Sequence, residues 1–396
     1  MRKGTYLRKG PRRALFARRR NTKPMAKRIL ITGGAGFVGS HLADELLDHG
    51  YTVRVLDNLS PQVHGPSRKR PDYLSDGVEL IVGDVRDPEM VGRALRRVDA
   101  VYHLAAAVGV GQSMYEIAEY TSTNAMGTAV LMEQLARRRV ERLIVASSMS
   151  IYGEGLYRSP RGEAVEVRER SLTQLKSHDW EIRGRDGEVL EPVPTPESKN
   201  PALPSVYAIN KYDQERLCMT VGRAYDISPV ALRFFNIYGT RQALSNPYTG
   251  VLAIFAARYL NGHPPLINED GFQQRDFVSV RDIVRACRLA LEVKEAAGEV
   301  FNIGSGKRHT IRQVAGAMAQ ALGCEHVEPE ITGRYRMGDI RNCFADISHA
   351  QEVLGYKPRV SLSQGLAELA EWLEGQTAED RAAEASQELI SRGLTV

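Results

Sequence analysis

The stretch SVYAINKYDQERL, residues 205–217, places a phenol and an ammonium four residues apart. On a helix, Tyr207 and Lys211 would share one face, because positions i and i+4 lie one turn apart. A nearby positive charge favours the ionised form of a tyrosine, so this pair could supply a general base. A surface tyrosine beside a solvated lysine is the alternative, and the stretch by itself leaves both open.

A glycine-rich turn near the start of the chain could hold a pyrophosphate. In KRILITGGAGFVGSHLADELLDHG, residues 27–50, a short β-branched run leads into three glycines and then an amphipathic helical pattern. The first glycine allows a tight turn, the second lets a pyrophosphate approach the backbone, and the third lets helix and strand pack closely. We therefore predict a dinucleotide site at Gly33, Gly36, Phe37, Val38 and Gly39.

An acidic residue ends the next predicted strand, TVRVLDN. Asp57 follows Gly39 by eighteen residues, where a carboxylate can accept hydrogen bonds from both hydroxyls of an adenosine ribose. It would repel a 2′-phosphate, which favours NAD over NADP. Three more strand-like runs follow, VELIVGDVRD, AVYHLAAAVGV and RLIVASSMSIYG. These runs would place Asp84, Val85, Leu104, Ala105, Ala106 and Ser147 beside the cofactor, together with Asn58, which directly follows Asp57.

Alternating strand and helix patterns predict an α/β protein, with a Rossmann-type, doubly wound parallel sheet and the cofactor across its carboxyl edge. We expect an NAD-binding domain over residues 25–240, interrupted by an inserted segment at 154–200. A smaller C-terminal substrate-binding lobe should span 241–375 and return segments to the first domain. Residues 376–396 are predicted to form a helical tail.

The net charge of +5 comes from one end of the chain. Residues 1–24 hold ten Lys or Arg and no acid, which leaves 43 basic against 48 acidic residues in the remainder. We expect the basic segment to be a disordered tail, and nothing indicates that the folded part binds nucleic acid. No apolar run approaches the roughly 18 residues of a membrane span. The four cysteines are scattered, which suits a reducing cytoplasm and argues against a disulfide framework and a cysteine-ligated zinc site.

The motifs TGGAGFVGSH, Asp57, HLAA, SSMSIYG, YAINK and LRFFNIYG occur in this order. Together they resemble the extended short-chain dehydrogenase/reductase family, specifically its NAD-dependent nucleotide-sugar epimerases and dehydratases, over residues 27–374. The resemblance implies catalysis by Ser148, Tyr207 and Lys211. Tyr207 would take a sugar hydroxyl proton while hydride leaves to NAD+, its pKa lowered by Lys211 and the nicotinamide. Ser147, Asn124 and Phe235 would lie beside the cofactor, and Lys211 would also bind the nicotinamide ribose.

The resemblance also implies a set of residues that bind the nucleotide sugar. Arg275 and Arg336 match pyrophosphate-binding arginines, whose planar guanidinium can contact a phosphate through two hydrogen bonds. The run TRQALSNPYTGVLAIFAARYLNGHPPLINEDG resembles the dTDP-L-rhamnose 4-epimerase-like subgroup. The predicted substrate residues are Ser148, Met149, Ser150, Asn236, Asn246, Arg275, Arg336 and Asp339.

Dehydratases of this family carry Thr-Asp-Glu where this chain has Ser148-Met149-Ser150. We therefore expect an epimerase that acts at C4 of an NDP-(deoxy)hexose through a transient keto sugar. A reductase or dehydratase is the alternative within the family. A non-catalytic NAD sensor is a further alternative, but it would be expected to lose the Tyr–Lys pair or the glycines. Family likeness also suggests a homodimer, formed by the helix that carries Tyr207 and the segment 116–138.

One departure from the family pattern stands out. Fifty-five residues lead from Tyr152 to Tyr207, more than ordinary family members have. The intervening segment is charged and proline-rich, which predicts an inserted loop or small subdomain. Members of the subgroup often carry two cysteine pairs here that resemble a zinc ribbon. This insert has none, so no zinc is expected and the role of the segment is open.

Overall fold

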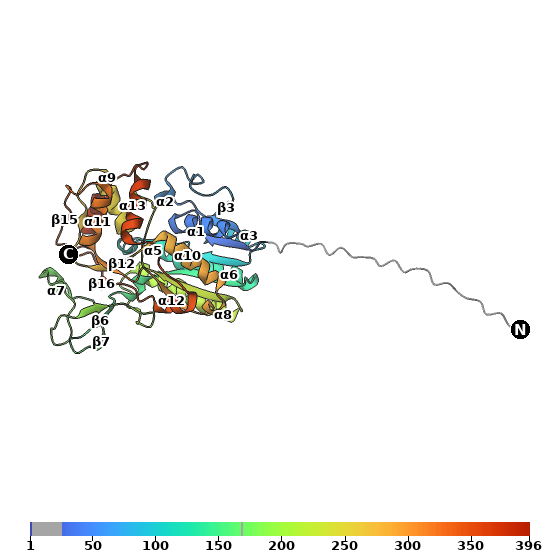
Figure 1. Ribbon diagram of the computed structural model, residues 1–396, viewed down its shortest axis with the longest axis horizontal. Helices are drawn as coiled ribbons and strands as arrows, with labels where there is room; N and C mark the ends of the chain where they lie inside the picture. The colour runs from blue at the N-terminus through green and yellow to red at the C-terminus, as the bar shows by residue number, and fades with distance from the viewer. Residues whose placement is uncertain (2–25, 168) are drawn as a thin grey trace.

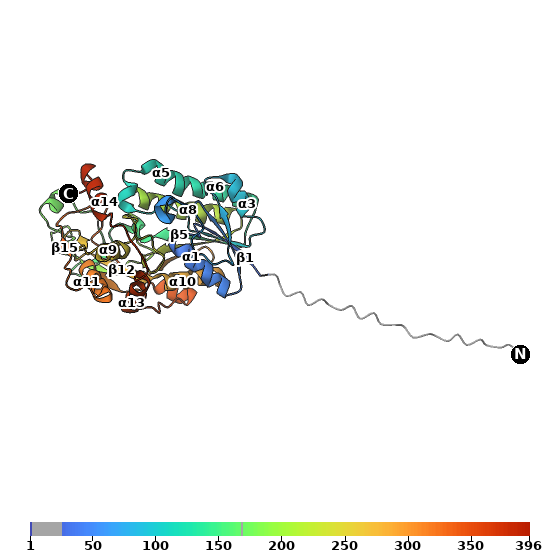
Figure 2. The same ribbon diagram turned by 90° about the horizontal axis from the view of Figure 1, so that it is seen from above.

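The computed structural model describes Met1 and residues 26–167 and 169–396 of the chain (Figures 1 and 2). Except for Met1, the predicted basic tail at 1–24 lies outside the described residues. Within residues 26–167 and 169–396, no helix combines the length and the apolar character needed to cross a membrane.

A seven-stranded parallel sheet forms the centre of the fold, in the order β13-β9-β5-β4-β1-β2-β3. Its central strands are apolar on both faces, as expected when helices cover both sides of a parallel sheet. The predicted fold class is therefore confirmed. The strands are β1 (Arg28–Thr32), β2 (Thr52–Asp57), β3 (Glu79–Val82), β4 (Ala100–His103), β5 (Arg142–Ser148), β9 (Ser228–Phe234) and β13 (Val300–Ile303).

Two hydrophobic cores lie on opposite faces of this sheet. Figure 2 shows the helix layers above and below it. One face is covered by α1 (Phe37–Asp48), α10 (Val280–Glu292) and α12 (Ser348–Leu354), and the other by α3 (Pro88–Ala94), α6 (Gly127–Arg137) and α8 (Val206–Ala224). Shorter helical segments near the carboxyl edge are α2 (Pro61–His64), α4 (Val110–Ser113), α5 (Ile117–Thr121) and the π-helical turn η1 (Ser122–Met126).

A third hydrophobic core holds the smaller lobe together. It is formed mainly by α9 (Val251–Leu260), α11 (Ile311–Leu322) and α13 (Leu362–Leu373). Short strands connect the lobe to the central sheet domain, and α14 (Ala382–Ser391) follows near the end of the chain. The strands are β10 (Asn236–Tyr238), β12 (Gln274–Ser279), β14 (Arg308–Thr310) and β16 (Asn342–Cys343), with β11 (Leu266–Ile267) and β15 (Glu330–Ile331) as a separate pair.

The inserted segment forms a small unit of its own. Its strands β6 (Leu156–Arg158), β7 (Ala164–Glu166) and β8 (Glu191–Val193) make an antiparallel sheet with β6 in the centre, and α7 (Leu172–Lys176) lies between β7 and β8 in the chain. Figure 1 shows β6, β7 and α7 at one end of the molecule, below the smaller lobe. Leu175 and Trp180 of the insert pack in one apolar cluster with Tyr335.

Candidate active site

A cavity of about 750 Å³ runs from the carboxyl ends of the parallel strands to the smaller lobe. The strand order reverses between β1 and β4, and ligands of doubly wound sheets bind at such a switch point. All the sequence-predicted site residues line this cavity except Asn124. Asn124 is fully buried and exchanges two hydrogen bonds with the backbone of Ala107, so it holds the loop after β4 in place.

The glycine turn forms one end of the cavity. Gly33 has a φ of +70°, and a Cβ there would lie 2.8 Å from the backbone of Ala105. A Cβ on Gly39 would lie 2.5 Å from the carbonyl oxygen of Gly33, so helix α1 packs directly on the turn. Gly36 precedes α1 and has no capping side chain among the described residues. The first N–H groups of α1 can therefore bind a phosphate, as the pyrophosphate of NAD requires.

Asp57 lies at the end of β2, 8% exposed, and lines the same cavity. One carboxylate oxygen accepts the backbone N–H of Ala35 at 3.0 Å, and the other accepts that of Leu59 at 2.9 Å. These bonds orient the carboxylate beside the glycine turn, and each oxygen keeps further lone pairs for a ribose hydroxyl. The donor and acceptor groups at this end therefore fit the adenosine diphosphate part of NAD.

Asp84 is engaged within the protein. It accepts hydrogen bonds from Arg86 at 2.8–2.9 Å, which lower the pKa of the Asp84 carboxyl, and Asn58 donates to it at 3.3 Å. Asp84 and Val85 both line the cavity, where the sequence predicts an adenine contact.

Ser148 and Tyr207 come together from different elements. Ser148 is the last residue of β5, and Tyr207 lies in the first turn of α8, which Ser205 caps by accepting the N–H of Ala208. Burial raises the pKa of Tyr207 to about 12, and a hydrogen bond with Ser148 opposes the shift. The sequence predicts a lowered pKa instead. The pKa rises because the loss of water around the phenol has a larger effect than the hydrogen bond with Ser148, which stabilises the ionised form.

Lys211 lies one turn further along α8, 4% exposed. Its ammonium donates a hydrogen bond of 2.9 Å to the side chain of Gln214, whose amide in turn donates to Thr128 at 2.9 Å. Burial lowers the pKa of Lys211 to about 8. Sequence reasoning missed Gln214, although its i+3 spacing from Lys211 is a signal that could have found it.

The opposite end of the cavity lies against the smaller lobe. Arg336 donates to Asp339 at 2.6 Å, so both side chains are held at the cavity wall. Arg275 lines the cavity and also donates to the backbone carbonyl of Arg341 at 2.9 Å. Met149 and Phe235, which directly follow β5 and β9, add apolar surface to the cavity, whereas Ile151 is fully buried and does not line it.

Three buried amide oxygens in the cavity wall have no hydrogen-bond donor among the residues that the structure describes. A buried acceptor without a donor is unfavourable, so a ligand that brings hydroxyl or N–H groups would satisfy them. Sequence reasoning identified one of them and missed the other two. They belong to Asn236, Gln242 and Gln273.

The sequence matches the model of the NAD dependent epimerase/dehydratase family over residues 29–173 and 182–304. This protein therefore belongs to that family, and the predicted family and its NAD dependence are confirmed. A curated relative, the dTDP-L-rhamnose 4-epimerase of Burkholderia thailandensis, is 34% identical over 356 residues, which cover 88% of this chain and 95% of the relative.

Solved structures agree with this assignment. A UDP-glucose 4-epimerase of Thermotoga maritima with UDP-glucose has a TM-score of 0.72 and 34% identity, covering 88% of this chain and 98% of that one. A UDP-glucuronic acid 4-epimerase from Bacillus cereus, in complex with UDP-glucuronic acid and NAD, has a TM-score of 0.69 and 28% identity. That match covers 88% of this chain and 99% of the other.

Proposed function

We propose that this protein is an NAD-dependent nucleotide-sugar 4-epimerase, acting on an NDP-(deoxy)hexose such as dTDP-L-rhamnose. The observation that carries the proposal is one continuous cavity. It joins the glycine turn and Asp57 at one end, Ser148 and Tyr207 in the middle, and Arg336 at the other end. This order suits a dinucleotide and a nucleotide sugar that meet at the tyrosine. The Burkholderia thailandensis relative favours the choice of sugar.

In this proposal the protein's own groups transfer the proton of the sugar C4 hydroxyl and stabilise the charge on its oxygen. Tyr207 accepts the proton of the sugar C4 hydroxyl, and Ser148 donates a hydrogen bond to the same oxygen as its charge develops. Lys211 binds the nicotinamide ribose and adds positive charge near the phenol. NAD+, when bound, would accept the C4 hydride and return it to the opposite face once the keto sugar has rotated, and its positive ring would favour the ionised phenol. Tyr207 would give the proton back to the C4 oxygen, so that the reaction leaves no NADH.

A dehydratase or reductase remains the alternative within the family. Dehydration would need an acid at the position of Met149, and this side chain is apolar and 7% exposed. A net reductase would need a cofactor that exchanges at each turnover.

The test is to follow both the sugar and the cofactor with the purified protein. NMR of reactions with dTDP-, UDP-, GDP- and ADP-sugars should reveal a C4 epimer for at least one sugar, with mass spectrometry reporting NAD bound to the protein. NADH should not accumulate. If NADH builds up at the rate of product formation, the enzyme is an oxidoreductase and the proposal fails.

We also propose that the protein is a homodimer formed through α5, η1, α6 and α8. Three large apolar side chains on these elements are solvent-exposed, at 49–58%. Burying them against a second copy would remove apolar surface from water. Light scattering at micromolar concentration should report a dimer, and a monomer would contradict the proposal. The side chains are Ile117, Met126 and Ile209.

The cytoplasm is the proposed location. All four cysteines lie in the described part of the chain and are free thiols, three of them buried. A protein built on free thiols suits a reducing compartment. Fractionation of cells that express the protein would test this, and recovery outside the cytoplasm would contradict it.

A further inference from the structure

The insert contributes a buried arginine to the smaller lobe. The Arg170 side chain is 2% exposed, and its guanidinium donates two hydrogen bonds, of 3.0 and 2.8 Å, to the two carboxylate oxygens of Glu269. It also donates to the backbone carbonyl of Trp180 at 3.2 Å and lies 5.2 Å from the ring centre of Tyr335. A bidentate pair of this kind fixes orientation as well as distance.

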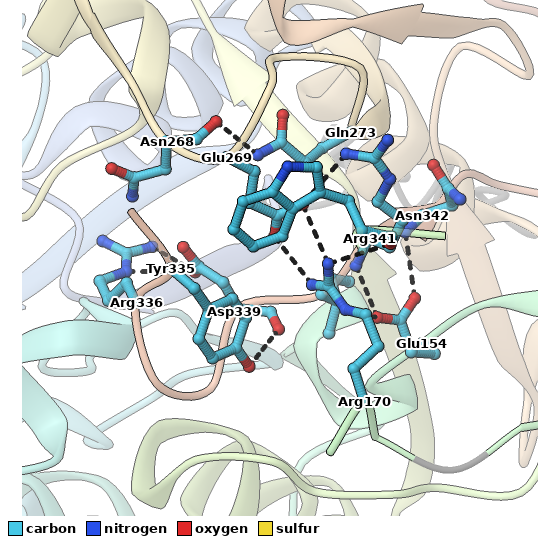
Figure 3. Close-up of polar contacts among 12 residues, drawn as sticks. Glu154, Arg170, Asn268, Glu269, Gln273, Tyr335, Arg336, Asp339, Arg341 and Asn342 are labelled. Carbon is cyan, nitrogen blue, oxygen red and sulfur yellow. Dashed lines mark hydrogen bonds and ion pairs between the residues drawn. The ribbon is translucent and has the colours of Figure 1, made fainter. Parts of the chain in front are cut away.

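Glu269 receives a second buried arginine from another part of the chain. Arg341 donates to Glu269 at 3.0 Å, and it also donates to Asp270 and to Glu181 of the insert, at 2.6 and 2.7 Å. Figure 3 shows Arg170, Glu269 and Arg341 in one cluster. Burial raises the pKa of Glu269, and the two guanidinium groups oppose this shift. Three chain segments are therefore joined at one carboxylate that is 1% exposed.

This cluster lies directly behind the cavity wall. Asn268, next to Glu269, lines the cavity, and so do Arg336 and Asp339, which precede Arg341 in one loop. The backbone N–H of Glu269 donates to the carbonyl of Arg334 at 2.8 Å, which links the two wall segments.

Tyr335 adds a second contact between the insert and this loop. It packs with Trp180, and its hydroxyl donates to the backbone carbonyl of Asp339 at 2.9 Å. The loop that carries Arg336 and Asp339 is thus held at two points (Figure 3). The insert contacts it at Tyr335, and Glu269, the partner of Arg170, binds it at Arg341.

We propose that Arg170 is a positioning residue for nucleotide-sugar binding, because it holds Glu269 and Tyr335 behind the wall formed by Asn268, Arg336 and Asp339. The insert is therefore a fixed support of the substrate subsite. This inference rests on the proposed function. Arg170 raises the affinity for a nucleoside diphosphate group without contacting the sugar or NAD.

The test compares Arg170→Met with Arg170→Lys and a matched control in the same insert. Arg183→Met is the control, because Arg183 also pairs with an acid, Asp179 at 2.9 Å, but on the exposed surface. Binding of dTDP and UDP is measured by titration calorimetry, and KM and kcat are measured for the sugar that turns over. NAD content and thermal unfolding are recorded for each variant.

Arg170→Met loses a hydrogen-bonded charge pair, which should raise Kd and KM about tenfold or more. We expect kcat to stay within about threefold, because the groups at the reacting atoms are unchanged. NAD content should equal that of the wild type, Arg170→Lys should recover part of the affinity, and Arg183→Met should bind normally. Unchanged Kd and KM in a folded Arg170→Met would overturn the inference. A parallel loss of kcat and NAD would overturn it too, since it indicates general unfolding.

A milder variant keeps the test decisive if Arg170→Met does not fold. Tyr335→Phe removes only the hydrogen bond to the carbonyl of Asp339, which should weaken nucleotide binding about fivefold. Normal binding by Tyr335→Phe would then overturn the inference. The proposed function has a separate readout. A wild type that binds neither dTDP nor UDP refutes the nucleotide-sugar assignment itself, whereas a variant effect on binding without any turnover supports positioning and refutes only the epimerase.

Discussion

The buried ammonium of Lys211 should lower the free energy of unfolding, and replacement of Lys211 by methionine should raise it. Burial lowers the pKa of Lys211 from 10.5 to about 8. Since one pKa unit corresponds to about 1.4 kcal/mol, the charged form destabilises the folded state by up to about 3 kcal/mol below pH 8. The hydrogen bond to Gln214, 2.9 Å long, offsets about 1 kcal/mol of this. Lys211→Met should therefore raise the free energy of unfolding by about 2 kcal/mol at pH 7.

The effect should depend on pH with a definite sign. Because the folded pKa of Lys211 is lower than the unfolded value, the unfolded chain binds more protons between about pH 8 and 10.5. Wild-type stability therefore gains from this group as the pH rises through that window. The advantage of Lys211→Met should shrink in parallel. Near pH 10.5 only the missing hydrogen bond remains, and the variant should be about 1 kcal/mol less stable than the wild type.

Urea unfolding of both proteins at pH 7, 8, 9 and 10 measures this difference. Lys307→Met is the matched control, because Lys307 is exposed and its replacement should change the free energy of unfolding only slightly. The reasoning is refuted if Lys211→Met is less stable than the wild type at pH 7. It is also refuted if the difference between the two proteins is constant across the series. The same variant should lose activity, so a stabilising change would coincide with a loss of function.

Further predictions concern activity. Tyr207→Phe should lower kcat by about 10²–10⁴ while nucleotide binding stays nearly normal, because only the ionisable oxygen is lost; near-normal turnover would disprove the assignment. Ser148→Ala should retain more activity than Tyr207→Phe, since it removes one hydrogen bond and not the proton acceptor; equal losses in kcat would contradict this. Asp57→Ala should weaken NAD binding about tenfold or more, and an unchanged Kd in a cofactor titration would refute the ribose contact.

Features with local sequence signals were predictable. The glycine turn, Asp57 and the Tyr207–Lys211 pair depend on short spacings within one strand–turn–helix unit or one helix, so the chain itself displays them. The alternation of strands and helices likewise predicted the parallel sheet. Burial of a single group was not predictable in this way. The pKa of Tyr207 in the structure is set first by loss of water around the phenol, which depends on how α8 packs.

Contacts between residues far apart in the chain could not be predicted from the sequence, because no local pattern indicates them. Arg170 and Glu269 are 99 residues apart in the chain, and an isolated arginine in a charged insert resembles a solvated surface residue. Asn124 was expected beside the cofactor, yet it holds the backbone of Ala107 from behind the cavity wall. Residues that act through a neighbour become visible only when the fold brings that neighbour to them.

The insert also leaves and rejoins the domain at nearly one point. At its return, the N–H of Ala202 donates to the carbonyl of Ile151, just before the insert begins, at 2.9 Å. When the two ends of an inserted segment already lie together, a change in its length costs little loop-closure entropy. Each doubling of the length costs about 0.6 kcal/mol. Ser148 and Tyr207 need not move when this happens, because they lie outside the inserted segment, on β5 and α8. A change in the segment between them can therefore alter the support of the substrate subsite while the reacting groups stay in place.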